Sequence, residues 1–317
     1  MLGIIYAGQG SQRVGMGQDF YEKYDSFKKI IDEASDVVSD VTAMDVAKLS
    51  FEGPIEQLSQ TQYTQPAMVA FAIGVTKLLK EEGIKADYTC GLSLGEYSAL
   101  YEADVLDEKS ILKLIAKRGK YMAEAAKGLD VKMAAVLGMD RDIVLECCTR
   151  ATADYNGEKI VQAANFNCPG QIVISGDAVA VDKASVYLKE AGAKRIMPLK
   201  VSGPFHTKLM KSAGDELKKE FESVDFKAEE SKVIYNCLGR ERTEDESVAE
   251  LLERQVQSSV YLEDSIRYMK DAGVDTIIEI GPGKAISKFI AKTVDDMKVY
   301  SIDTVDDFVN TIKELRA

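Results

Sequence analysis

The stretch Gly91-Leu92-Ser93-Leu94-Gly95 lies between residues 86–90, which favour a strand, and residues 96–100, which favour the start of a helix. A G-x-S-x-G pattern in this setting is typical of a nucleophile elbow, a sharp turn that lifts the serine hydroxyl out of a sheet. The N–H groups at the start of the helix lie near the serine and can stabilise an oxyanion. The alternative is a chance match, because the pattern is short.

Strand and helix patterns alternate on both sides of this elbow and predict an α/β fold. Residues 3–7 favour a first strand, which runs into the loop Gly8-Gln9-Gly10-Ser11-Gln12. Such a loop lies at the carboxyl edge of a sheet, where open α/β folds bind ligands. It lacks the glycine spacing of a dinucleotide or P-loop motif, so a phosphate site is not indicated. Further strand and helix pairs are expected at 275–280 with 285–292 and at 299–303 with 305–315.

Residues 130–198 have a different pattern and predict a separate small subdomain. Their order of elements is β-α-β-β-α-β, the ferredoxin-like arrangement. Such a unit can interrupt a larger one if its two ends lie close together, so we expect 1–129 and 199–317 to form one large subdomain. The expected elements are strands 133–137, 159–166, 171–175 and 194–198, helices 141–151 and 178–191, and a hairpin turn at 167–170.

Two helices of the large subdomain carry informative side chains. One is expected to begin at Thr64, with Pro66 in its first turn. The other is capped by Asp107 and places Arg118 where its apolar stripe requires a hydrophobic residue. A buried guanidinium needs an anion, either a structural Asp or Glu or the carboxylate of a substrate. The stripe consists of Ile111, Leu114, Ile115, Arg118 and Met122.

His206 is the only histidine of the chain, so any histidine-dependent chemistry has one candidate. Pro204 favours extended backbone just before it, which places His206 on a loop ahead of a helix at about 208–222. A lone histidine is often structural, whereas a polar loop position and a candidate serine nucleophile favour a catalytic role.

The composition is that of a globular protein: 317 residues, 46% hydrophobic and 29% charged, without an apolar run of membrane length. The apolar residues 1–7 lack the basic region of a signal peptide and favour a strand. The five cysteines show neither zinc nor redox spacing, so we expect no metal and a cytoplasmic location. A net charge of −12 disfavours nucleic acid and anionic membrane surfaces as partners.

Seven short motifs are distributed along the chain: 8–12 (GQGSQ), 64–67 (TQPA), 91–96 (GLSLGE), 117–119 (KRG), 165–171 (NFNCPGQ), 203–206 (GPFH) and 279–284 (EIGPGK). In kind and order they resemble the motifs of the malonyl-CoA:acyl carrier protein transacylase family, over nearly the whole length. The resemblance implies a hydrolase-like α/β large subdomain with a parallel sheet and an inserted ferredoxin-like small subdomain. This agrees with the pattern of elements.

The resemblance also implies roles for individual residues. Ser93 would be the acylated nucleophile and His206 its general base, while Arg118 would pair with the malonyl carboxylate. The backbone N–H groups of Gln12 and Leu94 would form the oxyanion hole.

The same resemblance implies that Gln65, Asn165 and Phe205 contact the substrate, with Phe205 crowding out a branched acyl chain. Leu92 stands where many members have histidine, so no imidazole in the elbow is expected to assist. The family orients its catalytic histidine with a backbone carbonyl in place of an acid, and we place that carbonyl in the segment around Tyr261.

The implied activity is ping-pong transfer of malonyl from malonyl-CoA to the phosphopantetheine thiol of acyl carrier protein in fatty-acid synthesis, without a cofactor. The alternatives are a serine hydrolase or thioesterase acting on a carboxylate-bearing acyl thioester, a polyketide-pathway acyltransferase, and a non-catalytic carrier-protein docking subunit. A monomer is expected. An acidic carrier protein would need a basic local surface on this acidic chain, unless its lysines are merely solvated. The candidates are Lys113, Lys117, Lys120, Lys189, Lys194, Arg195, Lys208 and Lys211.

Overall fold

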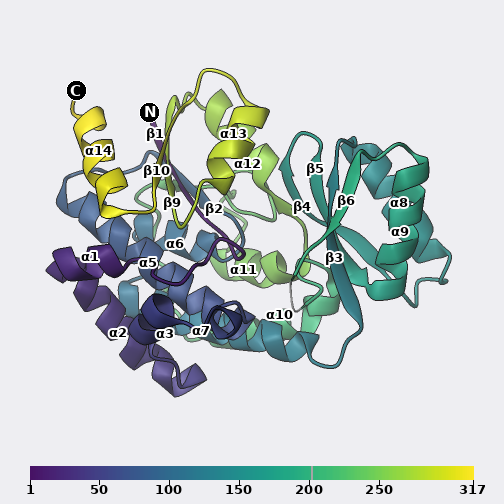
Figure 1. Cartoon of the computed structure of the whole chain (residues 1–317), viewed down its shortest axis with the longest axis horizontal. Coiled ribbons are helices and arrows are strands. Elements are labelled where there is room, and N and C mark those ends of the chain that lie inside the picture. The colour runs from purple at the N-terminus through teal and green to yellow at the C-terminus, as the bar shows by residue number, and fades with distance from the viewer. Residues whose placement is uncertain (201–202) are drawn as a thin grey trace.

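The computed structural model describes residues 1–200 and 203–317 and shows an α/β fold built on two five-stranded sheets. The part that contains the first sheet is the larger and carries both chain termini (Figure 1). The second sheet lies beside it along the long axis of the molecule. This arrangement confirms the predicted fold class.

Every strand pair of the first sheet is parallel, in the order β10-β9-β1-β2-β7. The predicted strands are confirmed to within two residues, whereas the short β7 is an addition that no sequence pattern indicated. The strands are β1 (Leu2–Tyr6), β2 (Tyr88–Gly91), β7 (Lys232–Val233), β9 (Thr276–Ile280) and β10 (Lys298–Ile302).

Helices pack on both faces of this sheet, so its central strand β1 is apolar along its whole length. In β1, Ile4 and Tyr6 belong to the core formed with α2, α5 and α7, while Ile5 belongs to the core formed with α12 and α13. The helices of this part are α1 (Gln18–Lys23), α2 (Asp25–Thr42), α3 (Val46–Glu52), α4 (Ile55–Leu58), α5 (Thr61–Glu81), α6 (Gly95–Glu102), α7 (Glu108–Ala126), the 3-10 turn η1 (Lys208–Met210), α10 (Lys211–Phe221), α11 (Val248–Gln257), α12 (Leu262–Asp271), α13 (Ala285–Thr293) and α14 (Val305–Leu315).

Helix α5 begins one turn earlier than predicted, at Thr61 rather than Thr64, so Pro66 lies inside it. A proline there removes the N–H that would bond the carbonyl four residues earlier. Burial outweighs this loss, because residues 64–76 are all buried and α5 packs against α2 and α7. The prediction for α7 is confirmed: the Asp107 carboxylate accepts the Ser110 N–H at 2.8 Å and caps the helix.

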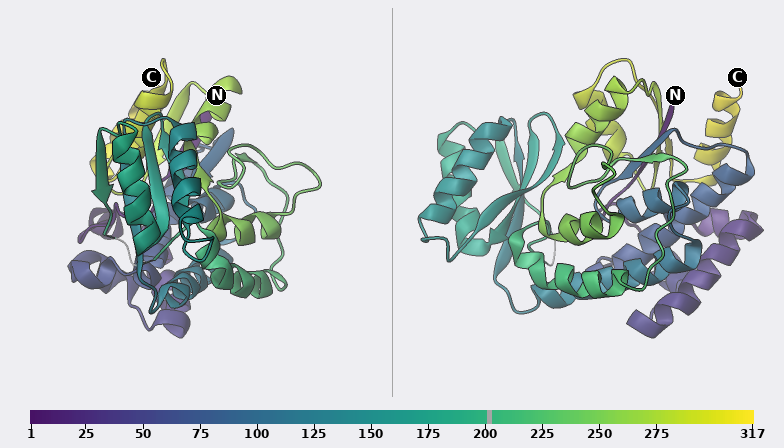
Figure 2. Two further views of the ribbon diagram at one scale, coloured as in Figure 1. Left: turned by 90° about the vertical axis from the view of Figure 1, so that its right-hand side faces the viewer. Right: turned by 180° about the vertical axis from the view of Figure 1, so that it is seen from behind.

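The second sheet has the order β6-β3-β5-β4-β8. Within it, β6, β3, β5 and β4 pair antiparallel with one another in this order, which confirms the predicted ferredoxin-like unit. Helices α8 and α9 cover the face turned away from the larger part (Figures 1 and 2). The elements are β3 (Val131–Leu137), α8 (Arg141–Ala153), β4 (Val161–Cys168), β5 (Gln171–Asp177), α9 (Ala178–Glu190), β6 (Arg195–Pro198) and β8 (Val260–Tyr261).

The fifth strand, β8, comes from a later part of the chain than the ferredoxin-like unit. It pairs parallel with β4, with Asn165 opposite Val260 and Phe166 opposite Tyr261. Helices α12 and α13 contact both β4 and strands of the first sheet, so they lie between the two sheets. We propose that 1–129 with 199–317 and 130–198 are the two subdomains, with β8 contributed by the larger one.

Candidate active site

A cavity of about 300 Å³ lies between the two sheets, over the carboxyl ends of β1 and β2. The larger part contributes the loop 8–11 and the elbow, and the smaller part contributes residues of β3, β4 and β5. Five of the predicted site residues line this cavity together: Gln65, Ser93, Asn165, Phe205 and His206.

Ser93 and His206 form a hydrogen-bonded pair at the cavity. Ser93 Oγ lies 2.7 Å from His206 Nε2, and His206 Nδ1 lies 2.9 Å from the backbone carbonyl of Gln255. A carbonyl only accepts, so Nδ1 carries the hydrogen and Nε2 is free to accept the serine proton. Ser93 has φ 58° and His206 has φ 60°, left-handed values that are unfavourable for non-glycine residues. Strain of this kind concentrates at functional sites.

The glycines of the elbow allow strand β2 and helix α6 to approach closely. A Cβ on Gly91 would lie 2.1 Å from the Gly95 carbonyl carbon, and a Cβ on Gly95 would lie 2.6 Å from the Tyr6 carbonyl oxygen. Both distances are too short for any side chain, so the G-x-S-x-G spacing has a steric cause here.

Arg118 on α7 is fully buried and touches the Ser93 hydroxyl. One terminal nitrogen donates to Gln65 Oε1 at 2.6 Å, and the other donates to Gln255 Oε1 at 2.9 Å and to Ser93 Oγ at 3.1 Å. Within 1–200 and 203–317, no carboxylate forms an ion pair with it, and its Nε has no hydrogen-bond partner. Within these ranges Arg118 therefore has no ion-paired acid, although its charge interacts with the buried Glu96. Arg118 does not itself line the cavity and reaches it through Gln65 and Ser93, which do.

Burial and neighbouring charge act on the titratable groups of the site. Burial raises the pKa of the Glu96 carboxyl to about 8, although the Asn236 N–H and the Arg118 charge act in the opposite direction. Burial, assisted by the Arg118 charge, lowers the pKa of His206 to about 4. The imidazole is therefore neutral and able to accept a proton over a wider pH range than an exposed histidine.

The acyl transferase domain family matches residues 4–307 of the sequence. The chain belongs to this acyl transferase family. The acyl transferase is 41% identical to the malonyl CoA-acyl carrier protein transacylase of Bacillus subtilis (strain 168), over 99% of the chain and 98% of that relative. The structure of malonyl CoA-acyl carrier protein transacylase from Clostridium perfringens shares 37% identity and a TM-score of 0.92, covering 99% of this chain and 97% of that one. A malonyl-transacylase solved in complex with a type II PKS acyl-carrier protein shares 32% identity and a TM-score of 0.92, covering 99% of each chain.

Of the two residues expected to supply oxyanion donors in this acyl transferase, Leu94 lies beside Ser93, whereas Gln12 lies away from the cavity lining. Leu94 follows the serine at the start of α6, and its N–H makes no hydrogen bond to another described residue. Gln12 does not line the cavity, and its side chain binds the Gly10 N–H and Ser59 instead. Gln9 lines the cavity, and its N–H also has no partner among the described residues. We therefore propose Gln9 in place of Gln12 as the donor from this loop.

The carbonyl that orients His206 belongs to Gln255 rather than to the segment around Tyr261, so that prediction is wrong. The Tyr261 carbonyl instead accepts the Ser265 hydroxyl at 2.8 Å. Because every residue has a carbonyl, no sequence signal marks Gln255 for this contact. The sequence analysis also did not predict the Gln255 side chain, which contacts both Arg118 and the Ser93 carbonyl.

Asn167 also lines the cavity and was not predicted as a site residue. Its Oδ1 is buried and has no hydrogen-bond partner in the described chain. Asn165 lies two residues earlier in the same strand, next to a register shift that interrupts the regular pairing of β4 with β5. Two residues of the motif at 165–171 therefore line the same cavity.

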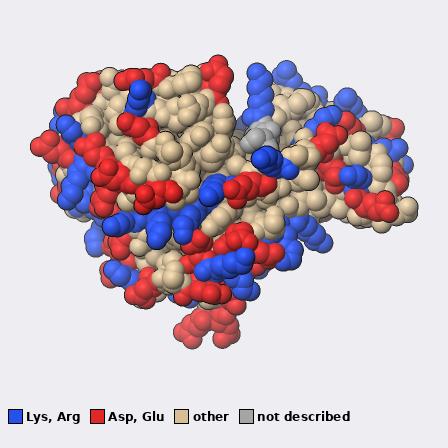
Figure 3. All heavy atoms as spheres, turned by 90° about the horizontal axis from the view of Figure 1, so that it is seen from below, with Lys and Arg blue, Asp and Glu red and all other residues tan. Residues whose placement is uncertain are grey.

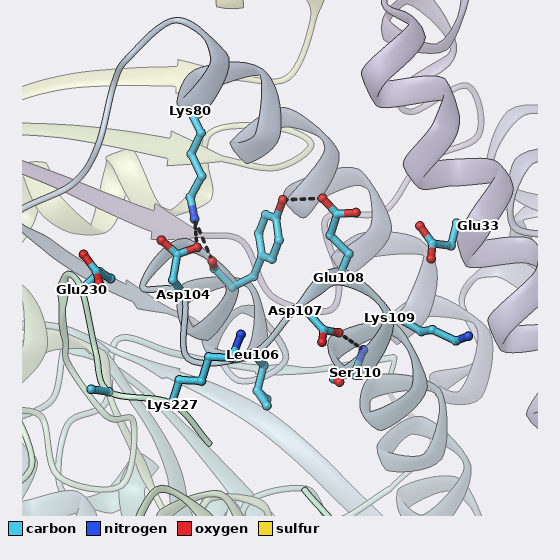
Figure 4. Close-up of a pocket in the computed structure, with 12 residues that line it drawn as sticks. Glu33, Lys80, Asp104, Leu106, Asp107, Glu108, Lys109, Ser110, Lys227 and Glu230 are labelled. Atoms are coloured by element: carbon cyan, nitrogen blue, oxygen red, sulfur yellow. Dashed lines mark hydrogen bonds and ion pairs between the residues drawn. The ribbon is translucent and has the colours of Figure 1, made fainter. Parts of the chain in front are cut away.

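A second cavity, of about 900 Å³, contains none of the predicted site residues (Figure 4). Some of its polar groups are bound to one another: Lys80 donates to Asp104 at 2.7 Å, and the Tyr101 hydroxyl donates to Glu108 at 2.9 Å. Asp107 caps α7 at its edge. Because none of the residues of the predicted serine chemistry lines it, we do not take this cavity as the active site. In the described part of the chain, no cluster of His, Cys, Asp or Glu is arranged to hold a metal, and no helix is apolar and long enough to cross a bilayer.

The lowered pKa of His206 predicts an unusual pH dependence. The kcat/KM for acylation of Ser93, which reports the free enzyme, is expected to stay level from pH 7 down to about pH 5 and to fall only near pH 4. The sign follows because the base is active when neutral, and a lowered pKa moves protonation to lower pH. A pH profile of CoA release would measure this. A fall centred near an ordinary histidine value of about 6.5 would contradict it.

Proposed function

We propose that this acyl transferase moves the malonyl group from malonyl-CoA to the phosphopantetheine thiol of acyl carrier protein, in fatty-acid synthesis in the cytoplasm. The observation that carries the proposal is Arg118, a fully buried guanidinium 3.1 Å from Ser93 Oγ without an acidic partner in the described chain. A guanidinium is well shaped to bind a carboxylate, and malonyl presents one a few bonds from its thioester. The names of the relatives support the same donor and acceptor.

In the first half-reaction, His206 Nε2 takes the Ser93 proton as Oγ attacks the thioester carbonyl. The N–H groups of Leu94 and Gln9 stabilise the negative charge on the carbonyl oxygen, each contributing about 3 kcal/mol by analogy with measured sites. The carbon–sulfur bond then breaks, His206 gives the proton to the departing sulfur, CoA leaves as a thiol, and malonyl-Ser93 remains. In the second half-reaction, His206 takes the proton of the carrier-protein thiol as its sulfur attacks the ester carbonyl. The bond to Ser93 Oγ then breaks, and His206 returns the proton to Oγ. No cofactor is required.

We propose roles for Gln65, Phe205 and Asn165 from their positions in the cavity lining. Gln65 holds one arm of the Arg118 guanidinium and so helps to orient it toward the malonyl carboxylate. Phe205 is 6% exposed and limits the width of the cavity next to His206, which disfavours a branched acyl chain. Asn165 offers an amide to the polar atoms of the bound thioester.

Labelling of Ser93 tests this function directly. Incubation with malonyl-CoA is expected to raise the intact mass by one malonyl group, carried by the peptide that contains Ser93, while the Ser93→Ala variant stays unlabelled. Addition of phosphopantetheinylated acyl carrier protein is then expected to remove the label and produce malonyl carrier protein. A wild-type chain that stays unlabelled would refute the proposal and favour a docking subunit.

Loss of the malonyl label also distinguishes two alternative acyl acceptors, water and a polyketide carrier protein. A serine hydrolase would lose the label in water alone, whereas a transacylase keeps it until a thiol is supplied. Transfer to a polyketide carrier protein is supported by the likeness to the complex with a type II PKS acyl-carrier protein. Comparison of discharge rates by the two kinds of carrier protein decides between the pathways.

The basic surface for the carrier protein is best sought near the cavity mouth. Lys and Arg side chains form several clusters on the face shown in Figure 3, interspersed with Asp and Glu. Lys117 is bound to Glu220 and Lys211 to Asp215, so both are partly neutralised. Lys208 is exposed and lies two residues after His206, so we propose it as the first candidate to test.

A further inference from the structure

Asn236 follows β7 and is almost completely buried, with 2% of its surface exposed. Its carboxamide makes two hydrogen bonds to the elbow: the Ser93 N–H donates to Oδ1 at 2.7 Å, and Nδ2 donates to the Gly91 carbonyl at 2.6 Å. Its backbone N–H donates to Glu96 Oε2 at 2.5 Å, in the first turn of α6. One residue therefore contacts the elbow before, at and after the serine.

These hydrogen bonds act where the backbone is strained. Ser93 has a left-handed φ of 58°, which serine does not adopt without support from its surroundings. Its N–H lies between the end of β2 and the start of α6, and Asn236 Oδ1 accepts it. The bond to Gly91 holds the preceding turn of the chain at the same time.

The other side of the Ser93 residue is held by Gln255, whose Nε2 donates to the Ser93 carbonyl at 2.9 Å. Gln255 also contacts Arg118 and His206, so replacing it would disturb several functions at once. Asn236 does not line the cavity, and within the described ranges it forms no hydrogen bond with Arg118 or His206. Its contribution can therefore be measured separately from substrate binding.

We propose that Asn236 is a positioning residue for the nucleophile: its carboxamide fixes the strained Ser93 backbone, which aims Oγ at His206 and the Leu94 N–H at the oxyanion. Asparagine suits this place because one planar group offers both an acceptor for the Ser93 N–H and a donor for the Gly91 carbonyl. Aspartate would keep the acceptor but would turn an oxygen toward the Gly91 carbonyl. The inference rests on the proposed role of Ser93 as nucleophile.

The test compares Asn236→Ala with the wild type in the first half-reaction. The rate of malonyl-Ser93 formation is expected to fall about 100-fold, with KM for malonyl-CoA changed less than about threefold, because Arg118 and the cavity lining stay in place. Asn236→Asp, which keeps the volume and one of the two hydrogen bonds, is expected to lose only about tenfold. The reaction of Ser93 with a small fluorophosphonate should slow in parallel, although this reagent carries no malonyl group.

A purely structural role is separated by a control in the same segment. Val233→Ala in β7 removes buried methyl groups without touching the elbow, so it is expected to lower the melting temperature and leave the acylation rate unchanged. The proposal is overturned if both Asn236 variants fold and keep wild-type rates, or if their loss appears in KM alone. If the wild type reacts with the fluorophosphonate but not with malonyl-CoA, the proposed function fails, while the phosphonate rates still test the positioning role.

Discussion

Replacement of Arg118 by alanine is expected to lower malonyl transfer roughly 150- to 5,000-fold, because removal of one partner of a buried ion pair costs about 3–5 kcal/mol. Acetyl transfer should change much less, since an acetyl group has no carboxylate to lose its partner. The ratio of kcat/KM for malonyl-CoA and acetyl-CoA therefore falls toward unity. Rates of CoA release with the two donors measure this ratio.

The matched control is Arg118→Lys, which keeps the charge but loses the fork that binds Gln65 and Gln255. An intermediate malonyl preference is expected, since a point charge still attracts the carboxylate but no longer fixes its orientation. Thermal melting of both variants checks that the fold survives. A preference for malonyl that persists undiminished in Arg118→Ala would show that the carboxylate is recognised elsewhere.

Those parts of the fold that depend on local pattern could be predicted from the sequence. The elbow, the ferredoxin-like order of residues 130–198 and the Asp107 cap each follow from residues close together in the chain. The two-residue strands β7 and β8 could not be predicted, because such short strands are defined only by their distant partners β2 and β4. The early start of α5 depends likewise on packing against other helices.

The same distinction applies to the candidate site. Ser93 and His206 could be proposed because their side chains are chemically distinctive, and Arg118 because it interrupts an apolar stripe. The contacts made by backbone groups could not, since every residue has a carbonyl and all but proline have an N–H. For this reason the sequence predicts the carbonyl beside His206 near Tyr261 rather than at Gln255, and it does not distinguish Gln9 from Gln12 as the loop donor.

Removal of the imidazole should have the largest effect of all. His206→Asn is expected to slow acylation of Ser93 on the order of 10⁴-fold, because no other group can accept the serine proton. Asparagine is chosen because it tolerates the left-handed φ of 60° at this position better than alanine does. Single-turnover acylation, followed by intact mass, measures the loss.

His206→Gly is the variant to compare with His206→Asn in a rescue experiment. Glycine also accepts this backbone conformation, and it leaves a space the size of the missing ring. Imidazole in the buffer is expected to enter that space, donate to the Gln255 carbonyl and restore part of the acylation rate in proportion to its neutral form. His206→Asn fills the space and should not respond. If imidazole restores neither variant, or if His206→Asn keeps more than about a tenth of the wild-type rate, another group is the base. The 2.7 Å contact between Ser93 and His206 would then serve only to hold the loop in place.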